Sequence, residues 1–164
     1  MNIIRQVASS MVKFKYMKRI IIYFCIAFGI SLADTVYHIP IEGTIDLGLP
    51  PFIERSIAEA EENNAKTIIF EVNTFGGRVD AATQIKDAIL DSKVPTVAFI
   101  NKRAISAGAL ISLSCEKVFM AGGATIGATT AVDMQGNKAS EKVISYMREE
   151  MAATAEKRGR DTYI

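Results

Sequence analysis

Short apolar, β-rich runs that alternate with helical patterns constrain this fold more than any other feature of the sequence. Residues 67–72 and 94–100 form two such runs, and residues 79–90 between them carry apolar side chains at helical spacing. A nearly continuous apolar run is typical of a strand covered on both faces, as in a parallel sheet. The alternation therefore predicts an α/β domain with a mostly parallel sheet and flanking helices.

The rest of the chain continues this alternation. We expect strands at 36–41, 67–72, 95–100 and 117–120, a short strand or turn at 125–127, and helices at about 52–63, 79–90, 107–112 and 141–158. Functional residues of parallel sheets lie on loops that follow the carboxyl ends of strands. In this chain the loops of that kind follow Val72, Ile100 and Met120.

The first 33 residues have the pattern of a secretory signal peptide. Lys18-Arg19 precedes an apolar run at 20–30 and a small-x-small site that ends at Ala33, where we expect cleavage. The run is shorter than the roughly 20 residues that span a bilayer, so an uncleaved membrane anchor is the alternative. A signal peptide that starts at Met17 would have an ordinary length. Residues 1–16 would in that case be an upstream extension. The sequence thus predicts an exported domain at 34–164.

Charge and metal-binding residues exclude several functions. Residues 34–164 carry 14 of the 19 basic and all 18 acidic residues, which leaves no basic footprint for nucleic acid. The chain has one histidine and two cysteines, and Cys25 lies inside the predicted signal peptide. Cys115 is then alone, so neither a disulfide nor an ordinary zinc site is expected. We expect no metal and no cofactor.

Ser106 is the candidate nucleophile. It lies in Ala104-Ile105-Ser106-Ala107-Gly108, where an apolar strand changes into an apolar helix. A serine at such a junction can present its hydroxyl beside backbone N–H groups. Its small neighbours Ala107, Gly108 and Ala109 should not block a substrate. The competing interpretation is a helix N-cap serine.

The candidate base is harder to find. His38 is the only histidine, and it lies on the first strand, far before Ser106 in the chain. A serine–lysine dyad remains possible, provided that its lysine is buried among apolar neighbours and can be neutral. Lys142 suits this role because it opens the last helix before Val143, Ile144, Tyr146 and Met147. Lys138 lies in a polar loop and should be solvated.

Two further motifs flank these residues. Gly76-Gly77 follows a strand and precedes a helix, so its backbone N–H groups could form half of an oxyanion hole. The alternative is an ordinary tight turn between a strand and a helix. Lys157-Arg158-Gly159-Arg160 ends the last helix, and its basic residues are expected to complement the helix dipole.

Four segments occur in an order and spacing that resemble a known family, namely residues 73–77, 104–108, 124–128 and 156–160. They are similar to the N-terminal protease domain of the NfeD family, membrane-bound serine proteases of the ClpP class. The resemblance covers about residues 35–164. It implies a ClpP/crotonase-like fold and a serine–lysine dyad of Ser106 and Lys142, with an oxyanion hole formed by the N–H groups of Gly77 and Ala107.

The same resemblance implies a function. Relatives cleave membrane-associated proteins at hydrophobic segments, have stomatin-like partners and assemble at least as dimers. We therefore expect an exported or membrane-associated serine endopeptidase that forms homo-oligomers.

Two departures from the family pattern keep other functions open. The family usually has proline at the position of Phe75, and full-length relatives continue with more of the protease domain, transmembrane helices and a small β-barrel. The resemblance thus implies a domain that is incomplete at its C-terminus. A catalytically inactive ClpP-like scaffold or interaction module of membrane quality control is the alternative. The export signal argues against a third reading, a crotonase-type acyl-CoA enzyme.

Overall fold

The computed structural model describes Met17, residues 34–127 and residues 139–162. The chain separates into two units, Met1–Ala33 and Asp34–Ile164. Apart from Met17, the predicted signal peptide with its possible extension lies outside the described residues, as do Lys138 and Ala128. No helix in the described ranges is both long enough and apolar enough to cross a bilayer.

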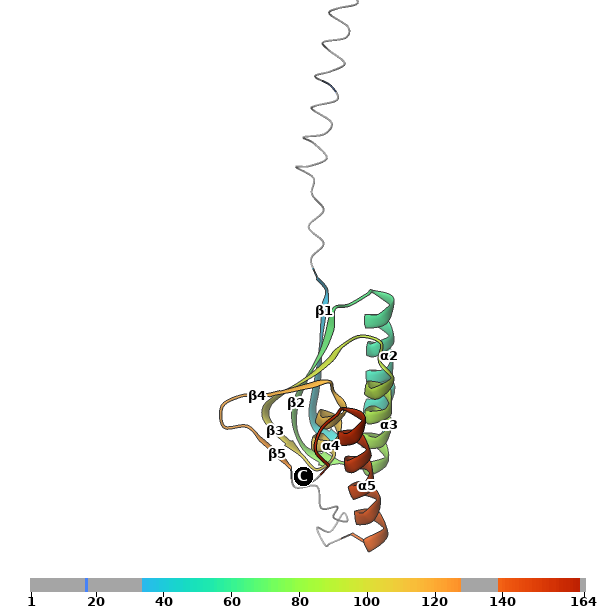
Figure 1. Cartoon of the computed structure of the whole chain (residues 1–164), viewed down its shortest axis with the longest axis vertical. Helices are drawn as coiled ribbons and strands as arrows, with labels where there is room; N and C mark the ends of the chain where they lie inside the picture. Colours follow the sequence, from blue (N-terminus) through green and yellow to red (C-terminus); the bar gives the residue numbers. More distant parts are fainter. Residues whose placement is uncertain (1–16, 18–33, 128–138, 163–164) are drawn as a thin grey trace, which may run out of the picture. The chain divides into compact units, whose positions relative to one another are not determined.

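The second unit is an α/β domain with strands and helices in alternation (Figure 1). Its sheet has the strand order β1-β2-β3-β4, with β5 also paired to β3, and every described pairing is parallel. The predicted fold class is therefore confirmed. The elements are β1 (Val36–Ile45), α2 (Leu49–Glu62), β2 (Thr67–Gly77), α3 (Val79–Asp91), β3 (Thr96–Ile105), α4 (Ala107–Ser114), β4 (Lys117–Met120), β5 (Thr125–Gly127) and α5 (Glu141–Lys157).

The central strands are longer than the sequence indicated. The predicted ends at Ile41, Val72 and Ile100 were wrong, because each strand continues after an irregularity. The register shifts at 42–44 in β1 and at 72–74 in β2, and Gly43 in the first shift has φ +73°. Beyond these shifts β5 replaces β4 as the neighbour of β3. The segments expected to be loops after Val72 and Ile100 are thus a second, offset part of the same sheet, whereas residues 121–124 after Met120 form the expected connection.

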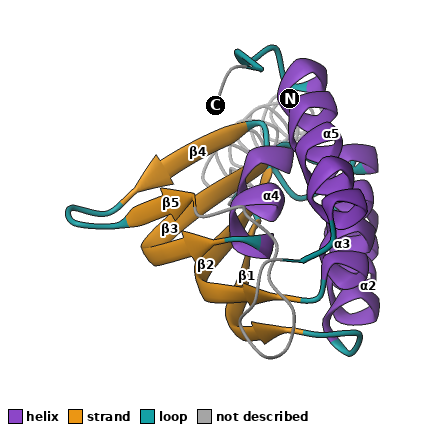
Figure 2. Ribbon diagram, turned by 90° about the horizontal axis from the view of Figure 1, so that it is seen from below, coloured by secondary structure: helices purple, strands orange, loops and turns teal. Residues whose placement is uncertain are grey.

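All four helices lie on one side of the sheet (Figure 2). Along β2, Ile68, Phe70 and Val72 are buried under the helices, whereas Ile69 and Glu71 on the opposite face are half-buried. The expectation that β2 is covered on both faces was therefore wrong, because the described residues cover only its helix-facing side fully. The core fills the space between the sheet and the apolar faces of α2 and α3, which contribute Ile53, Ile57, Ile85 and Ile89.

Helix α2 begins three residues earlier than predicted. Its first turn contains Pro50 and Pro51, which the sequence analysis placed before the helix. Proline is tolerated there because the N–H groups of a first turn have no partner within the helix.

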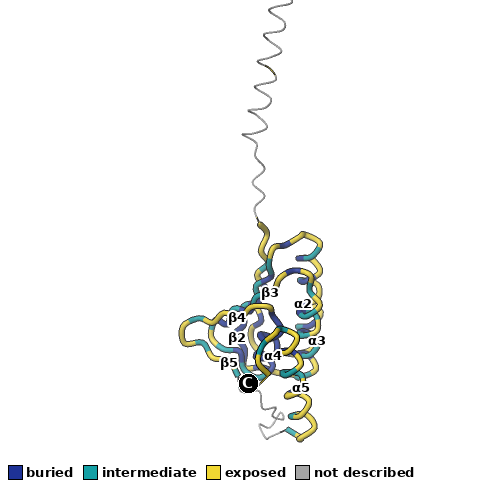
Figure 3. Tube along the Cα trace, in the orientation of Figure 1, coloured by how far each residue is buried: buried dark blue, intermediate teal, exposed yellow. Residues whose placement is uncertain are grey.

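Helix α4 is buried along its entire length of eight residues (Figure 3). The hydroxyls of Ser112 and Ser114 donate to the carbonyls of Gly108 and Ile111, each at 2.7 Å. Both hydroxyls are therefore satisfied within α4 itself. The described structure thus places Ser106 at the start of a helix that the rest of the domain encloses.

Candidate active site

Ser106 occupies the junction between β3 and α4 with φ 55° and ψ −115°. A positive φ at a non-glycine residue costs about 1–3 kcal/mol and persists only where the surroundings enforce it. Its N–H donates to the Gly127 carbonyl at 2.8 Å, and its carbonyl accepts from Ala109 N at 2.9 Å. Ser106 is the N-cap residue of α4, as the competing interpretation expected, but its side chain makes no capping hydrogen bond to the helix. The hydroxyl is therefore not used in holding the helix.

Gly76 contacts the Ser106 turn. A Cβ atom on Gly76 would lie 2.9 Å from both the Ile105 carbonyl oxygen and Ser106 Cβ, and 3.3 Å from Ala107 N. Gly76 also has φ +105°, which an L side chain rarely adopts. Only glycine lets the end of β2 approach the serine this closely. At Gly77, a Cβ would overlap the backbone of Ile45.

The backbone N–H groups near Ser106 have different partners. The N–H of Gly76 donates to Thr74 Oγ1 at 2.9 Å, and that of Ser106 is taken by Gly127. These two groups are thus engaged within the protein. The structure brings Gly76, Ser106 and Ala107 into contact, and Gly77 follows directly at the end of β2.

Thr74 supports this arrangement, and the sequence analysis missed it. Its buried hydroxyl donates to the Gly43 carbonyl at 2.5 Å while accepting from Gly76 N. Its methyl group abuts Gly108, where an added Cβ would lie 2.5 Å from Thr74 Cγ2. Ala107, Gly108 and Ala109 are themselves buried, so their small size also serves packing. The sequence signal that could have identified Thr74 is its position as a polar residue within the glycine-containing segment 73–77.

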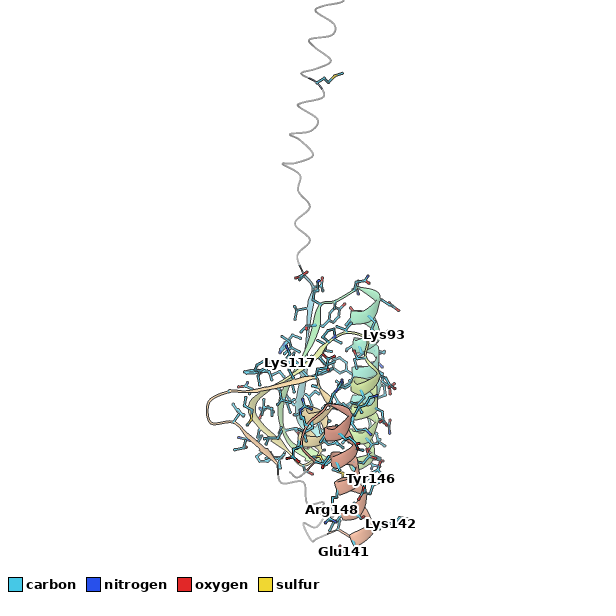
Figure 4. All side chains as sticks on the ribbon, in the orientation of Figure 1. Lys93, Lys117, Glu141, Lys142, Tyr146 and Arg148 are labelled. Atoms are coloured by element: carbon cyan, nitrogen blue, oxygen red, sulfur yellow. The ribbon has the colours of Figure 1, made fainter. Side chains whose placement is uncertain are left out.

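Lys142 lies in the first turn of α5, after the N-cap Ser140, whose hydroxyl accepts from Val143 N at 3.4 Å. It is exposed, and no hydrogen bond joins it to Ser106 among the residues that the structure describes. The expected burial of Lys142 was wrong for this chain because Ile144 and Met147 face the core, whereas Lys142 lies on the same side of α5 as Tyr146 (Figure 4).

A cavity of about 710 Å³ lies beside Lys142. Its apolar walls are Val79, Val143 and Tyr146, and Arg78 and Asp80 complete the lining. The Arg78 guanidinium holds Asp80 with two hydrogen bonds of 2.9 and 2.7 Å and lowers the pKa of that carboxyl. Arg78, which follows Gly77 directly in the chain, lines this cavity together with Lys142.

His38 is remote from the serine. It pairs in register with Ile69 on β2, seven positions before Gly76, which corresponds to about 20 Å along the strand. Its Nε2 lies 2.7 Å from Glu71 Oε2 on the face of the sheet opposite the helices. A triad that uses this histidine is therefore incompatible with the fold.

Lys86 is the most buried described lysine near α5, yet it is unsuited to act as a base. Burial lowers its pKa, but hydrogen bonds to Asp87 and Glu150 outweigh that effect, and the net pKa is raised. The Glu150 carboxylate lies 2.7 Å away and ties α3 to α5. Lys86 therefore remains protonated.

Phe75 projects from β2 next to the glycine pair. It is 73% exposed, and the Arg103 guanidinium of β3 lies 4.4 Å from the ring centroid. This is a cation–π contact on the face of the sheet that carries no helix. The ring thus lies beside the candidate site and does not enter the core.

The described domain has the fold of the ClpP-like proteases. The 1510-N stomatin-specific membrane protease of Pyrococcus horikoshii has the same fold. A serine-to-alanine mutant of it is 32% identical, with a TM-score of 0.73 over 80% of this chain and 68% of that chain. A lysine-to-alanine mutant in complex with a substrate peptide is 31% identical, with a TM-score of 0.74 over 80% and 64%. ClpP1 of Listeria monocytogenes, 24% identical with a TM-score of 0.62 over 76% and 74%, supports the fold alone.

Residues 35–164 match the family model described as the N-terminal domain of NfeD1b, and the chain belongs to this family. The membrane protein NfeD1b of Bacillus subtilis is 43% identical over 128 residues, which is 78% of this chain and 29% of that protein. The membrane-bound protease PH1510 of P. horikoshii is 32% identical over 152 residues, or 88% and 34%. The chain thus spans about a third of the length of these relatives. The predicted resemblance to the NfeD family is confirmed.

Proposed function

We propose that this chain is a serine endopeptidase in which Ser106 is the nucleophile and Lys142 is the general base. The observation that carries the proposal is the strained Ser106 junction, held against Gly76 inside a ClpP-like protease fold. Strain of this kind is typical of residues whose orientation matters more than their stability. Serine and lysine variants of a protease relative point to the same two residue types.

The proposed reaction follows the serine–lysine scheme. Ser106 Oγ attacks the peptide carbonyl and passes its proton to the neutral amine of Lys142. The N–H groups of Gly77 and Ala107 stabilise the oxyanion of the tetrahedral intermediate. As the C–N bond breaks, Lys142 returns the proton to the leaving amine. It then takes a proton from the water that attacks the acyl ester and passes this proton to Ser106 Oγ as the ester C–O bond breaks, which restores the free serine and the neutral amine.

An exposed lysine has to be shielded from water before it can work in this way. We propose that an apolar substrate segment supplies this shielding by filling the cavity between Val79, Val143 and Tyr146. The substrates would be hydrophobic segments of membrane-associated proteins, with a stomatin-like protein as partner, in keeping with the named specificity of the 1510-N relative. The proposal also includes a signal peptide at 1–33, an exported or membrane-associated location and assembly into homo-oligomers.

The test combines peptide cleavage with labelling by a serine-reactive phosphonate. Ser106→Ala should abolish both, and Lys142→Ala should lower cleavage about 10³-fold by removing the base. Lys93→Ala is the matched control, since this lysine is 86% exposed and lies at the other end of the helical layer (Figure 4). It should leave cleavage unchanged. Undiminished cleavage in either dyad variant would contradict the mechanism.

A second candidate is an inactive scaffold or interaction module, which the exposed position of Lys142 favours. Such a protein would bind the apolar peptide without cleaving it, and Ser106 would not react with the phosphonate. The labelling experiment therefore separates the two functions.

A further inference from the structure

Two arginines at the end of α5 bind the C-terminal end of α4. Arg158 Nε donates to the Ser114 carbonyl at 2.6 Å, and its Nη2 donates to the Ile89 carbonyl of α3 at 3.3 Å. These side chains were expected to complement the dipole of their own helix. Instead they connect the ends of three helices.

Arg160 makes the denser contact. Its Nη1 donates to the Leu113 carbonyl at 2.5 Å, and its Nη2 donates to the carbonyls of Cys115 and Glu116 at 2.8 and 3.1 Å. One guanidinium therefore binds three backbone carbonyls at the end of α4 and just beyond it. A lysine cannot reproduce this planar fork of donors.

These carbonyls need partners from outside the helix. The last four carbonyls of any helix lack an intrahelical N–H, and an unsatisfied polar group in a buried position is costly. Leu113, Ser114 and Cys115 are all buried, so water cannot easily satisfy them. The two arginines thus fix the position of the C-terminal end of α4.

The opposite end of the same helix carries Ser106. Eight residues span about 12 Å, and a helix this short does not hold its shape alone. No side chain caps its N-terminus. A displacement of α4 along its axis would alter the close approach of Gly76 to the Ser106 turn, where a Cβ on Gly76 would lie 2.9 Å from Ser106 Cβ, and would relax the strained turn.

We propose that Arg160, assisted by Arg158, is a positioning residue that holds the Ser106 turn in its strained geometry through α4. The same pair fixes the C-terminal end of α5, whose first turn carries Lys142. Both helices that bear the proposed dyad are therefore held at their far ends by one clamp. This inference rests on the proposed function of Ser106.

The test variants are Arg160→Lys and Arg160→Ala. The control is a core variant of α2, either Ile53→Val or Ile57→Val, whichever lowers Tm by an amount closest to that of the arginine variant. Phosphonate labelling of Ser106 is measured well below the unfolding transition. We expect labelling of both arginine variants to fall about 10²-fold, the effect of a displacement near 1 Å. The control should label like the wild type, and millimolar methylguanidinium should partly restore Arg160→Ala.

Amide exchange provides a readout that does not depend on activity. The N–H groups of Ala109 and Leu110 donate to the Ser106 carbonyl, so their exchange reports on the turn itself. They should exchange faster in Arg160→Lys than in the Tm-matched control. If the wild type is not labelled at Ser106, the proposed function fails, and this exchange rate alone decides the clamp. Labelling and exchange equal to the control would overturn the positioning role, because the arginine would then contribute stability only.

Discussion

Replacing Gly76 by alanine would place a methyl group against the Ser106 turn. The new Cβ would lie 2.9 Å from the Ile105 carbonyl oxygen and from Ser106 Cβ, both closer than folded proteins allow. Holding alanine at φ +105° costs about 1–3 kcal/mol, and overpacking adds about 1–3 kcal/mol. We expect a total loss of about 2–6 kcal/mol in the free energy of unfolding. Because the backbone has to move to relieve the contact, Ser106 should also lose its reactivity.

The assay is denaturant unfolding together with phosphonate labelling of the folded protein. Gly123→Ala is the matched control, since Gly123 has φ +80° but nothing within 4 Å of an added Cβ. This control carries the conformational cost without the contact, so it should lose about 1–3 kcal/mol and keep normal labelling. If Gly76→Ala unfolds like Gly123→Ala and reacts like the wild type, the inferred contact between β2 and the serine is refuted.

Other perturbations test the surroundings of the site. Thr74→Val removes the hydrogen bonds to Gly43 and Gly76 and should cost about 1–3 kcal/mol in denaturant unfolding, whereas Thr74→Ser should retain most of the stability. Burial raises the pKa of the Cys115 thiol to about 12, so a thiol reagent at pH 8 should modify it only after unfolding; modification of the native chain would contradict its burial. Because the pKa of Lys86 is raised in the folded state, its pairing with Glu150 should stabilise the fold below the pKa of the unfolded chain. That stability should be lost as the pH rises through the folded pKa. Glu150→Gln should reduce this alkaline loss in urea titrations at increasing pH, and an unchanged pH profile would argue against the pair.

The elements with strong local signals could be predicted from the sequence. The periodicity of α3, the β-rich run at the start of β2 and the short β4 follow from side-chain pattern alone, whereas residues 125–127 were expected as either a strand or a turn. Ser106 was also identified, because small residues between an apolar strand and an apolar helix have few other uses. The glycine pair was recognised for its backbone freedom.

The strand ends could not be predicted, because pairing partners decide them. Asn73 and Gly76 disfavour a strand locally, yet β1 and β3 supply ladder partners that carry β2 through both residues. The arginine clamp was missed for a similar reason: Arg158 and Arg160 lie about 45 residues from their carbonyl partners along the chain. Only the folded chain brings these groups together.

Lys142 shows where inference from sequence neighbours fails on a helix. The apolar residues that follow it suggested a buried amine, but successive residues on a helix point about 100° apart. Ile144 and Met147 turn toward the core, so Lys142 is directed to the cavity shared with Arg78 and Tyr146. Ser106, the proposed nucleophile, is thus held by packing within this domain, whereas Lys142, the proposed base, lies in an open cavity that a substrate would have to cover. A peptidase built in this way would couple its catalytic competence to the arrival of an apolar substrate.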